Sequence, residues 1–297
     1  MSSDRNQPPS FTALAVREEA RAKINLALHV TGRRADGYHE LDTLVGFPPF
    51  GDVLAAAPAD DLSLTVSGPF AADLGPSCDN LVMRAASLLR EAFAIRAGAA
   101  LVLEKRLPVA SGIGGGSADA AAALRALVRL WGLDPADPRI ADIATRLGAD
   151  VPMCLASRPL RASGIGEVLH PVAELPAGGL VLANPRVAVA TPAIFKALKR
   201  RDNPPLCDMP TFADARALAE WLAAARNDLQ PPAIETAPII ADVLEALAAL
   251  PGALIARMSG SGATCFALFD DEATAKAATG ALAAAHSEWW ICQTRLA

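Results

Sequence analysis

A glycine-rich segment that leads directly into a helical pattern is the strongest constraint on how this chain folds. From Leu107 to Trp131 it reads LPVASGIGGGSADAAAALRALVRLW, with glycines at positions 112, 114, 115 and 116. The residues that follow have the i, i+3, i+4, i+7 spacing of an apolar helix face: Leu124, Leu127, Val128 and Trp131. The segment therefore predicts a loop that delivers the chain to a helix N-terminus.

Such a loop is suited to binding a bulky anion. Glycines have no Cβ atom to block a close approach, and successive N–H groups can converge on phosphate oxygens. The unpaired N–H groups at the following helix N-terminus add to the attraction. Asp119 falls in the first helical turn, where a carboxylate is favourable. A phosphate site and a purely structural glycine turn both fit this pattern.

Two common nucleotide-binding motifs do not fit. No Lys-Ser or Lys-Thr pair follows the glycines, which excludes the Walker A form. Ser117 occupies the place of the third glycine in a G-x-G-x-x-G pattern, which excludes that register. The loop is therefore of a different type, and its function depends on the rest of the chain.

Length and composition indicate a globular protein of one large domain or two ordinary ones. The chain has 297 residues, of which 52% are hydrophobic, and a net charge of −5. The acidic balance argues against nucleic acid as a partner. Five scattered cysteines without a C-x-x-C pair favour a reducing compartment. No apolar run approaches the roughly 18 residues of a membrane span, and no signal peptide is apparent. We expect a cytoplasmic protein.

An alternating pattern near the N-terminus predicts a strand over 22–30. Ile24, Leu26 and Leu28 point to one face, and Lys23 and Asn25 share the other. Taken alone, this polar face also fits a solvated sheet edge.

Two further places carry chemically useful side chains. Asp36-Gly37 predicts a tight turn, directly followed by Tyr38 and His39, a pair that could stack on and hydrogen-bond a base. Asp150 follows a helix end and lies two residues before a proline, in a constrained loop. A packed turn and a surface carboxylate, respectively, are the alternative interpretations.

The remaining pattern predicts an α+β protein. We expect a tail over 1–12, an N-terminal domain over 13–160 and a C-terminal domain over 161–297. Thr191 and Thr211 are predicted to cap helices. A β-β-α-β run at the C-terminus suits a split α/β sandwich. The predicted strands are 22–30, 61–67, 99–104, 253–258, 263–269 and 289–295, and the predicted helices are 80–93, 118–131, 138–147, 191–196, 211–225, 238–252 and 272–285.

Separate stretches together resemble one family. They are AKINLALHVTGRRADGYHELDTL (22–44), LPVASGIGGGSADAA (107–121) and RMSGSGATCFALF (257–269), with LGADVP, TPAIFK and ND between the second and third. In this order they resemble the GHMP kinases, named for galactose, homoserine, mevalonate and phosphomevalonate substrates. The resemblance implies a two-domain fold, with an ATP-binding domain like ribosomal protein S5 domain 2 and a ferredoxin-like split βαβ domain.

The resemblance also implies roles for residues. Lys23 and Asp150 would be catalytic: Asp150 would accept or orient the proton of the attacking hydroxyl, and Lys23 would keep Asp150 ionised. The loop would wrap the ATP phosphates. Its residues are Pro108, Val109, Ala110, Ser111, Gly112, Ile113, Gly114, Gly115, Gly116, Ser117 and Ala118.

The first of these stretches resembles one branch of the family, which phosphorylates the 2-hydroxyl of 4-diphosphocytidyl-2-C-methyl-D-erythritol in the non-mevalonate isoprenoid pathway. Asn25 would contact the polyol and His39 the cytosine edge, while Tyr38 and Phe195 would stack on the base. Thr191 would join the substrate site, and the 259–262 turn would close it.

The implied cofactors are ATP and Mg²⁺, for which Ser117 is the candidate protein ligand. The alternatives are another GHMP small-molecule kinase, of the homoserine or mevalonate type, and a non-catalytic binding protein on the same fold. The partners we expect are ATP and a small-molecule substrate. The sequence leaves the oligomeric state open.

Overall fold

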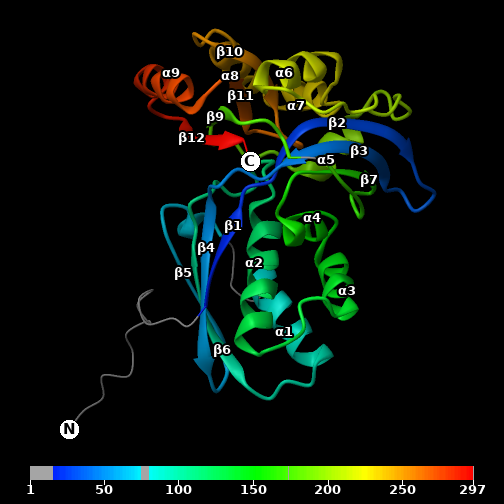
Figure 1. Ribbon diagram of the computed structural model, residues 1–297, viewed down its shortest axis with the longest axis vertical. Coiled ribbons are helices and arrows are strands. Elements are labelled where there is room, and N and C mark those ends of the chain that lie inside the picture. The colour runs from blue at the N-terminus through cyan, green and yellow to red at the C-terminus, as the bar shows by residue number, and fades with distance from the viewer. Residues whose placement is uncertain (1–15, 75–79, 173, 297) are drawn as a thin grey trace. The chain divides into compact units, whose positions relative to one another are not determined.

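The computed structural model describes residues 16–74, 80–172 and 174–296, arranged in helices and strands (Figure 1). The strands are β1 (Val16–Arg21), β2 (Ile24–Arg33), β3 (His39–Gly46), β4 (Gly51–Ala59), β5 (Leu62–Ser67), β6 (Gly98–Glu104), β7 (Leu160–Gly164), β8 (Val168–Pro171), β9 (Gly178–Asn184), β10 (Ala253–Met258), β11 (Cys265–Phe269) and β12 (Trp290–Leu296). The helices are α1 (Leu81–Ala92), α2 (Gly115–Leu130), α3 (Pro138–Leu147), α4 (Val151–Ala156), α5 (Thr191–Ala197), α6 (Ala215–Ala224), α7 (Gln230–Thr236), α8 (Ile239–Ala248) and α9 (Glu272–Ala285), with a 3₁₀ turn at Ala71–Asp73.

The chain forms two compact units that interleave in sequence. The first contains the residues up to Ala20, Gly51–Val109 and Gly116–Leu155. The second contains Arg21–Phe50, Ala110–Gly115 and the residues from Ala156 onward. The glycine loop therefore draws its residues from both units. The division of the chain into an N-terminal and a C-terminal domain at residue 160 stays a prediction.

The first unit is a four-stranded sheet with helices on one face. Its strand order is β1-β4-β6-β5, antiparallel between β4 and β6 and parallel between β5 and β6. Helices α1, α2 and α3 lie beside this sheet in Figure 1. Six alanines of α2 are fully or almost fully buried, which lets the helix pack closely against its neighbours: Ala118, Ala120, Ala121, Ala122, Ala123 and Ala126.

Local capping explains where two of these helices begin. The side chain of Asn80 accepts a hydrogen bond from the Val82 N–H at the start of α1, and Asp137 does the same for Arg139 at the start of α3. Both side chains satisfy an N–H group that the helix itself leaves unpaired. Pro138 occupies the first turn of α3, where its missing N–H costs nothing.

The second unit contains two further sheets, ordered β2-β3-β7-β8 and β10-β11-β9-β12. One apolar core lies between helices and the second of these sheets. It combines Val181 of β9 and Ala267 of β11 with Val243 of α8 and Ala278 of α9, and it also includes Leu28 of β2. Strand β2 is thereby held to the rest of the unit.

The predicted elements are confirmed where the pattern was local and periodic. Helix 138–147 and strand 253–258 match α3 and β10 residue for residue, and the strand predicted over 22–30 is β2. Both faces of β2 are buried up to Val30, so its polar face is not a solvated edge. Lys23 lies just before the strand begins.

Two predicted caps are wrong. Thr191 is the first residue of α5 rather than its N-cap, and the N-cap residue, Ala190, has no side-chain hydrogen bond to the helix. Asp214, not Thr211, caps α6 by accepting from the Ala217 N–H. In each case another residue lies at the observed helix boundary. The sequence reading also missed β1, β3, β4, β7, β8 and β9, together with α4 and α7. None of the helices that the structure describes is both long and apolar enough to cross a bilayer.

Candidate active site

The glycine loop has left-handed backbone conformations. The φ angles of Ala110, Gly112 and Gly114 are 51°, 77° and 66°. At Gly112 a Cβ atom would lie 2.6 Å from the carbonyl oxygens of both Ser259 and Gly262. Position 112 therefore requires glycine both for its conformation and for the space around it.

The loop lies against the turn at 259–264, far away in sequence. The Thr264 N–H donates to the Ser111 carbonyl at 3.1 Å, and the Ser259 hydroxyl donates to the Gly112 carbonyl at 3.1 Å. A Cβ atom at Gly260 would lie 2.6 Å from the Gly112 oxygen. That the 259–262 turn closes the site, as the resemblance implies, stays a prediction; in the structure this turn supports the loop directly.

Lys23 lies beneath the same loop. Its N–H donates to the Ile113 carbonyl at 2.9 Å, and its Cβ would lie 3.2 Å from a Cβ at Gly114. The residue is only 5% exposed. Glycine at position 114 therefore leaves room for the lysine side chain beside the loop.

Asn25 is buried beside the supporting turn. Its N–H donates to the Ser259 hydroxyl at 3.0 Å, and its Nδ2 donates to the Thr43 hydroxyl at 2.8 Å. Its Oδ1 is buried and has no hydrogen-bond partner within the described residues. A buried acceptor without a partner is costly and suits a site that receives a hydroxyl or amide from a ligand.

The predicted base-binding residues meet at the start of β3. The His39 and Phe195 rings are stacked, with centroids 5.0 Å apart and planes inclined by 24°. His39 Nε2 is buried and has no partner in the described part of the chain, whereas Tyr38 is 59% exposed. Burial lowers the pKa of His39, and the positive charges of Arg33 and Arg201 lower it further. The ring is therefore neutral at neutral pH.

Thr191 is tied to the supporting turn by its hydroxyl, which lies 2.7 Å from the Ser261 hydroxyl. The second unit thus brings together Lys23, Asn25 and the 110–115 part of the loop around Ser259–Gly262, and it brings His39 together with Phe195.

The first unit carries the rest of the predicted site. Pro108 and Val109 lead into the loop, while Gly116, Ser117 and Ala118 form the first turn of α2. Ser117 is half-buried in this turn. Asp150 is half-buried directly before α4, and its carbonyl accepts from the Cys154 N–H at 3.1 Å. Its approach to Lys23, which belongs to the other unit, stays a prediction.

A buried ionic cluster beside the loop was missed by the sequence reading. Lys105 Nζ lies 2.5 Å from Asp52 Oδ2 and 2.7 Å from Asp119 Oδ2. Asp52 Oδ1 also accepts from the N–H groups of Arg106 and Leu107. The cluster therefore ties β4 to both the entrance of the loop and the second turn of α2. The prediction that Asp119 lies in the first helical turn is wrong, because α2 begins at Gly115 and places Asp119 in the second turn.

The cluster contains two carboxylates and one ammonium. Burial opposes the charge on Lys105, but Asp119 and Asp52 outweigh it and raise the pKa of Lys105. Burial raises the pKa of Asp119 well above its usual value; the nearby Asp52 adds to this, while Lys105 opposes it. Lys105 is thus firmly charged, and the raised pKa of Asp119 makes it bind a proton more readily than an ordinary aspartate does.

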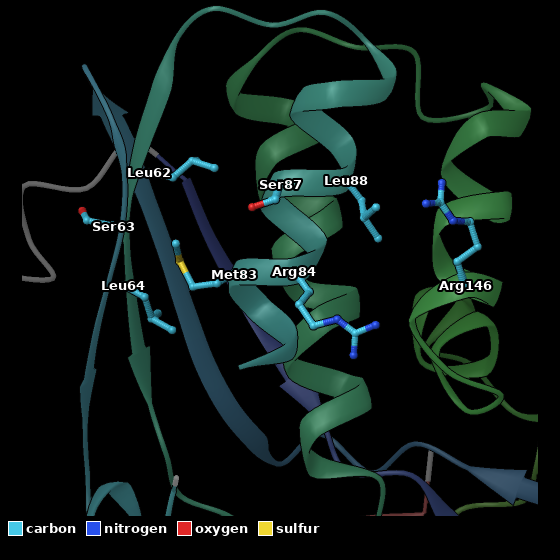
Figure 2. A pocket seen from close by; sticks show the side chains of 8 residues that line it. All are labelled: Leu62, Ser63, Leu64, Met83, Arg84, Ser87, Leu88 and Arg146. Carbon is cyan, nitrogen blue, oxygen red and sulfur yellow. The ribbon is translucent and has the colours of Figure 1, made fainter. Parts of the chain in front are cut away.

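A groove of about 670 Å³ lies elsewhere on the first unit (Figure 2). Strand β5 contributes Leu62 and Leu64, α1 contributes Met83 and Arg84, and α3 contributes Arg146. None of the residues that line it belongs to the predicted site.

Comparison with known proteins identifies the family. The description "GHMP kinases N terminal domain" matches residues 80–158, and "GHMP kinases C terminal" matches residues 194–288. Together they span more than half of the chain, and the chain therefore belongs to the GHMP kinase family. The resemblance, the α+β two-domain fold and the kinase class inferred from the sequence are confirmed.

Relatives of high identity share one name, 4-diphosphocytidyl-2-C-methyl-D-erythritol kinase. The protein of that name from Cereibacter sphaeroides (strain ATCC 17029 / ATH 2.4.9) is 57% identical over 93% of this chain and 98% of its own. The one from Paramagnetospirillum magneticum is 54% identical over 94% of this chain and 97% of its own.

Solved structures share the fold of this chain. A crystal structure of 4-(cytidine 5'-diphospho)-2C-methyl-D-erythritol kinase is 37% identical, covers 94% of this chain and 98% of its own, and has a TM-score of 0.79. Homoserine kinase from Cytophaga hutchinsonii, at 18% identity, covers 95% of this chain and 94% of its own with a TM-score of 0.64, and shares the fold.

Proposed function

We propose that this protein transfers the γ-phosphoryl group of ATP to the 2-hydroxyl of 4-diphosphocytidyl-2-C-methyl-D-erythritol. One observation carries the proposal. A single compact unit contains both a lysine beneath the glycine loop and a stacked His39–Phe195 pair, and the Nε2 atom of His39 is buried without a hydrogen-bond partner among the described residues. A kinase for a substrate without a base has no use for the second feature. The name shared by the relatives supports the same substrate.

The glycine loop would hold ATP. The left-handed conformations at 112 and 114 leave the loop outside helical geometry, so its backbone N–H groups can donate to phosphate oxygens. The positive end of the α2 dipole adds to the attraction for the phosphates. Mg²⁺, bound with ATP, would neutralise charge on the phosphates. Ser117 is the candidate protein ligand, since its hydroxyl is a hard oxygen donor in the first turn of α2.

Lys23 and Asp150 would act on the hydroxyl. Asp150 would accept or orient its proton, and the ammonium of Lys23 would stabilise the negative charge that develops as the phosphoryl group moves. The buried position of Lys23 supports this role, because charge interactions are stronger out of water.

The cytidyl group would bind at the start of β3. Tyr38 is exposed and can supply a stacking face, and Phe195 supplies a second one. The unpartnered Nε2 of His39 would hydrogen-bond the cytosine edge. The unpartnered Oδ1 of Asn25 would accept from the polyol, and Thr191 would line the same site.

The test is transfer of label from γ-labelled ATP to the cytidyl substrate, with homoserine and mevalonate as competing acceptors in parallel reactions. We expect label in the cytidyl product alone. Label in homoserine or mevalonate instead would assign the chain to another branch of the family. The lack of transfer to all three would favour a non-catalytic binding protein.

The proposal includes a cytoplasmic location, where ATP is available, and small molecules rather than nucleic acid as partners. The net charge of −5 supports the latter point, since binding to a phosphate backbone requires a basic surface.

A further inference from the structure

Two arginines beside His39 have no carboxylate partner in the described part of the chain, whereas their neighbours in sequence do. Arg34 pairs with Asp36 at 3.3 Å, and Arg200 pairs with Asp202 at 3.2 Å. Within residues 16–74, 80–172 and 174–296, no ion pair involves Arg33 or Arg201. In each consecutive pair of arginines, 33–34 and 200–201, a carboxylate of the described residues therefore neutralises one charge and leaves the other.

The sheet register places Arg33 next to His39. The two residues are direct cross-strand partners at the turn end of the β2–β3 hairpin, where residues 34–38 connect the strands. The preceding pair is Gly32 and Glu40, and Glu40 Oε2 lies 2.8 Å from the position of a Gly32 Cβ. Because side chains alternate between sheet faces, Glu40 is on the face opposite to Arg33 and His39. It therefore does not neutralise Arg33.

Arg201 reaches the same place from another element. Its Nη2 donates to the carbonyl of Lys196, the residue after Phe195, at 3.5 Å. Its Nε is buried and has no hydrogen-bond partner among the described residues, as is also true of His39 Nε2. The charge of Arg201 acts on the His39 ring, as does that of Arg33, because each lowers the pKa of His39.

The loop that carries Arg201 is anchored to the same sheet. The Asn203 N–H donates to the Val30 carbonyl at 3.0 Å, and the Leu206 N–H donates to Asp42 Oδ2 at 2.8 Å. Arg161 holds Asp42 with a two-pronged hydrogen bond and also donates to the Leu206 carbonyl. These hydrogen bonds anchor the loop to the sheet and therefore fix the position of Arg201.

We propose that Arg33 and Arg201 form an anion site beside His39 and Phe195, which binds the diphosphate of the nucleotide-linked substrate. The inference rests on the proposed function and adds residues that recognise the charge of the substrate rather than its base. A guanidinium matches phosphate oxygens in geometry and charge, and a buried N–H without a partner is satisfied by such an acceptor. The two guanidinium groups beside His39 supply one positive charge for each of the two phosphate groups.

The test compares cytidine with CDP by isothermal titration calorimetry, with a saturating non-hydrolysable ATP analogue present to occupy the glycine loop. We expect the wild-type chain to bind CDP more tightly than cytidine, and more weakly as KCl is raised. Arg201→Gln and Arg33→Gln should each lower the affinity for CDP about tenfold or more, while changing the affinity for cytidine less than about twofold. The matched control is Arg200→Gln, which should leave both affinities unchanged.

Thermal melting of each variant shows whether it is folded, and Arg201→Lys provides a variant that keeps the charge. We expect Arg201→Lys to retain part of the preference for CDP. If Arg201→Gln lowered the affinities for cytidine and CDP equally, Arg201 would contact the base and the proposal would be overturned. An unchanged affinity for CDP in that variant would overturn it as well. Tight CDP binding without phosphoryl transfer in the wild-type chain would instead count against the proposed function and leave the anion site standing.

Discussion

The ammonium of Lys105 lies 2.7 Å from the carboxyl group of Asp119, and this contact joins the residue at the entrance of the glycine loop to the second turn of the helix that follows. Asp52 completes the contact from β4 at 2.5 Å. The ends of the glycine loop are thus held by buried charges rather than by the loop residues themselves. Such a support shell restricts the geometry of the groups that contact the ligand.

Lys105→Met should destabilise the protein strongly. The substitution leaves two buried carboxylates without their ammonium, and breaking a buried ion pair in this way costs about 3–5 kcal/mol. Urea unfolding checks this prediction. Asp119→Asn should cost less, because Lys105 keeps Asp52 as its partner.

Lys199→Met is the surface control for this experiment. Lys199 pairs with Glu235 but is 81% exposed, so its removal should change stability by less than about 0.5 kcal/mol. Equal effects of the two lysine substitutions would show that burial of the cluster does not matter.

Gly112→Ala should disrupt the glycine loop. The added Cβ would lie 2.6 Å from two backbone oxygens, at a φ of 77° that alanine rarely adopts. We expect ATP affinity, measured by calorimetry, to fall at least tenfold, about 1.4 kcal/mol, because the loop must shift off the 259–264 turn. Gly280→Ala is the matched control. No atom lies within 4 Å of its Cβ position in α9, and helix propensity predicts a gain of about 0.5–1 kcal/mol.

Asp150→Asn should lower turnover while leaving ATP binding nearly intact. An amide cannot accept the proton of the attacking hydroxyl, and general-base catalysis contributes about 10²–10⁴-fold. Steady-state turnover and ATP titration of the same preparation measure the two effects. Asp142→Asn, an exposed position on α3, is the control. Unchanged turnover in Asp150→Asn would remove this residue from the mechanism.

Tyr38→Ala should weaken binding of the cytidyl substrate by about 1–3 kcal/mol, the contribution of one stacked base. Because Tyr38 is 59% exposed, the melting temperature should hardly change. Tyr38→Phe keeps the ring and should retain the affinity. If the alanine variant binds the substrate as well as wild type, Tyr38 does not stack on the base.

The neutral His39 ring predicts a direction of pH dependence. Its pKa is lowered below the ordinary 6.5 by burial and by Arg33 and Arg201. Between the lowered value and 6.5 the unfolded chain binds more protons than the folded chain, so stability rises with pH in this window. The contribution of His39 is therefore present above pH 6.5 and is lost as pH falls through its folded pKa.

NMR titration of the His39 ring measures this pKa directly. Arg201→Gln should raise it towards the ordinary value, because one of the positive charges that oppose protonation is gone. The pKa would remain unchanged in that variant if Arg201 did not act on the ring.

The sequence alone determined the features that depend on neighbouring residues. The spacing of apolar residues identified α3 and β10, and the order of the motifs identified the family. These signals are readable because a helix face or a tight turn is specified within a few residues. Strand β9 lacked such a signal, since a strand buried on both faces does not alternate, and β3 and β4 are buried on both faces over most of their length.

Only the tertiary structure decided which distant residues share an environment. The Gly112 carbonyl meets the Ser259 hydroxyl across 147 positions of sequence, and Lys105 finds Asp52 across 53. Arg201 differs from Arg200 only in where the fold directs its side chain, yet among the described residues Arg200 forms an ion pair and Arg201 does not. Burial and partner choice come from packing between segments, and no local pattern encodes them.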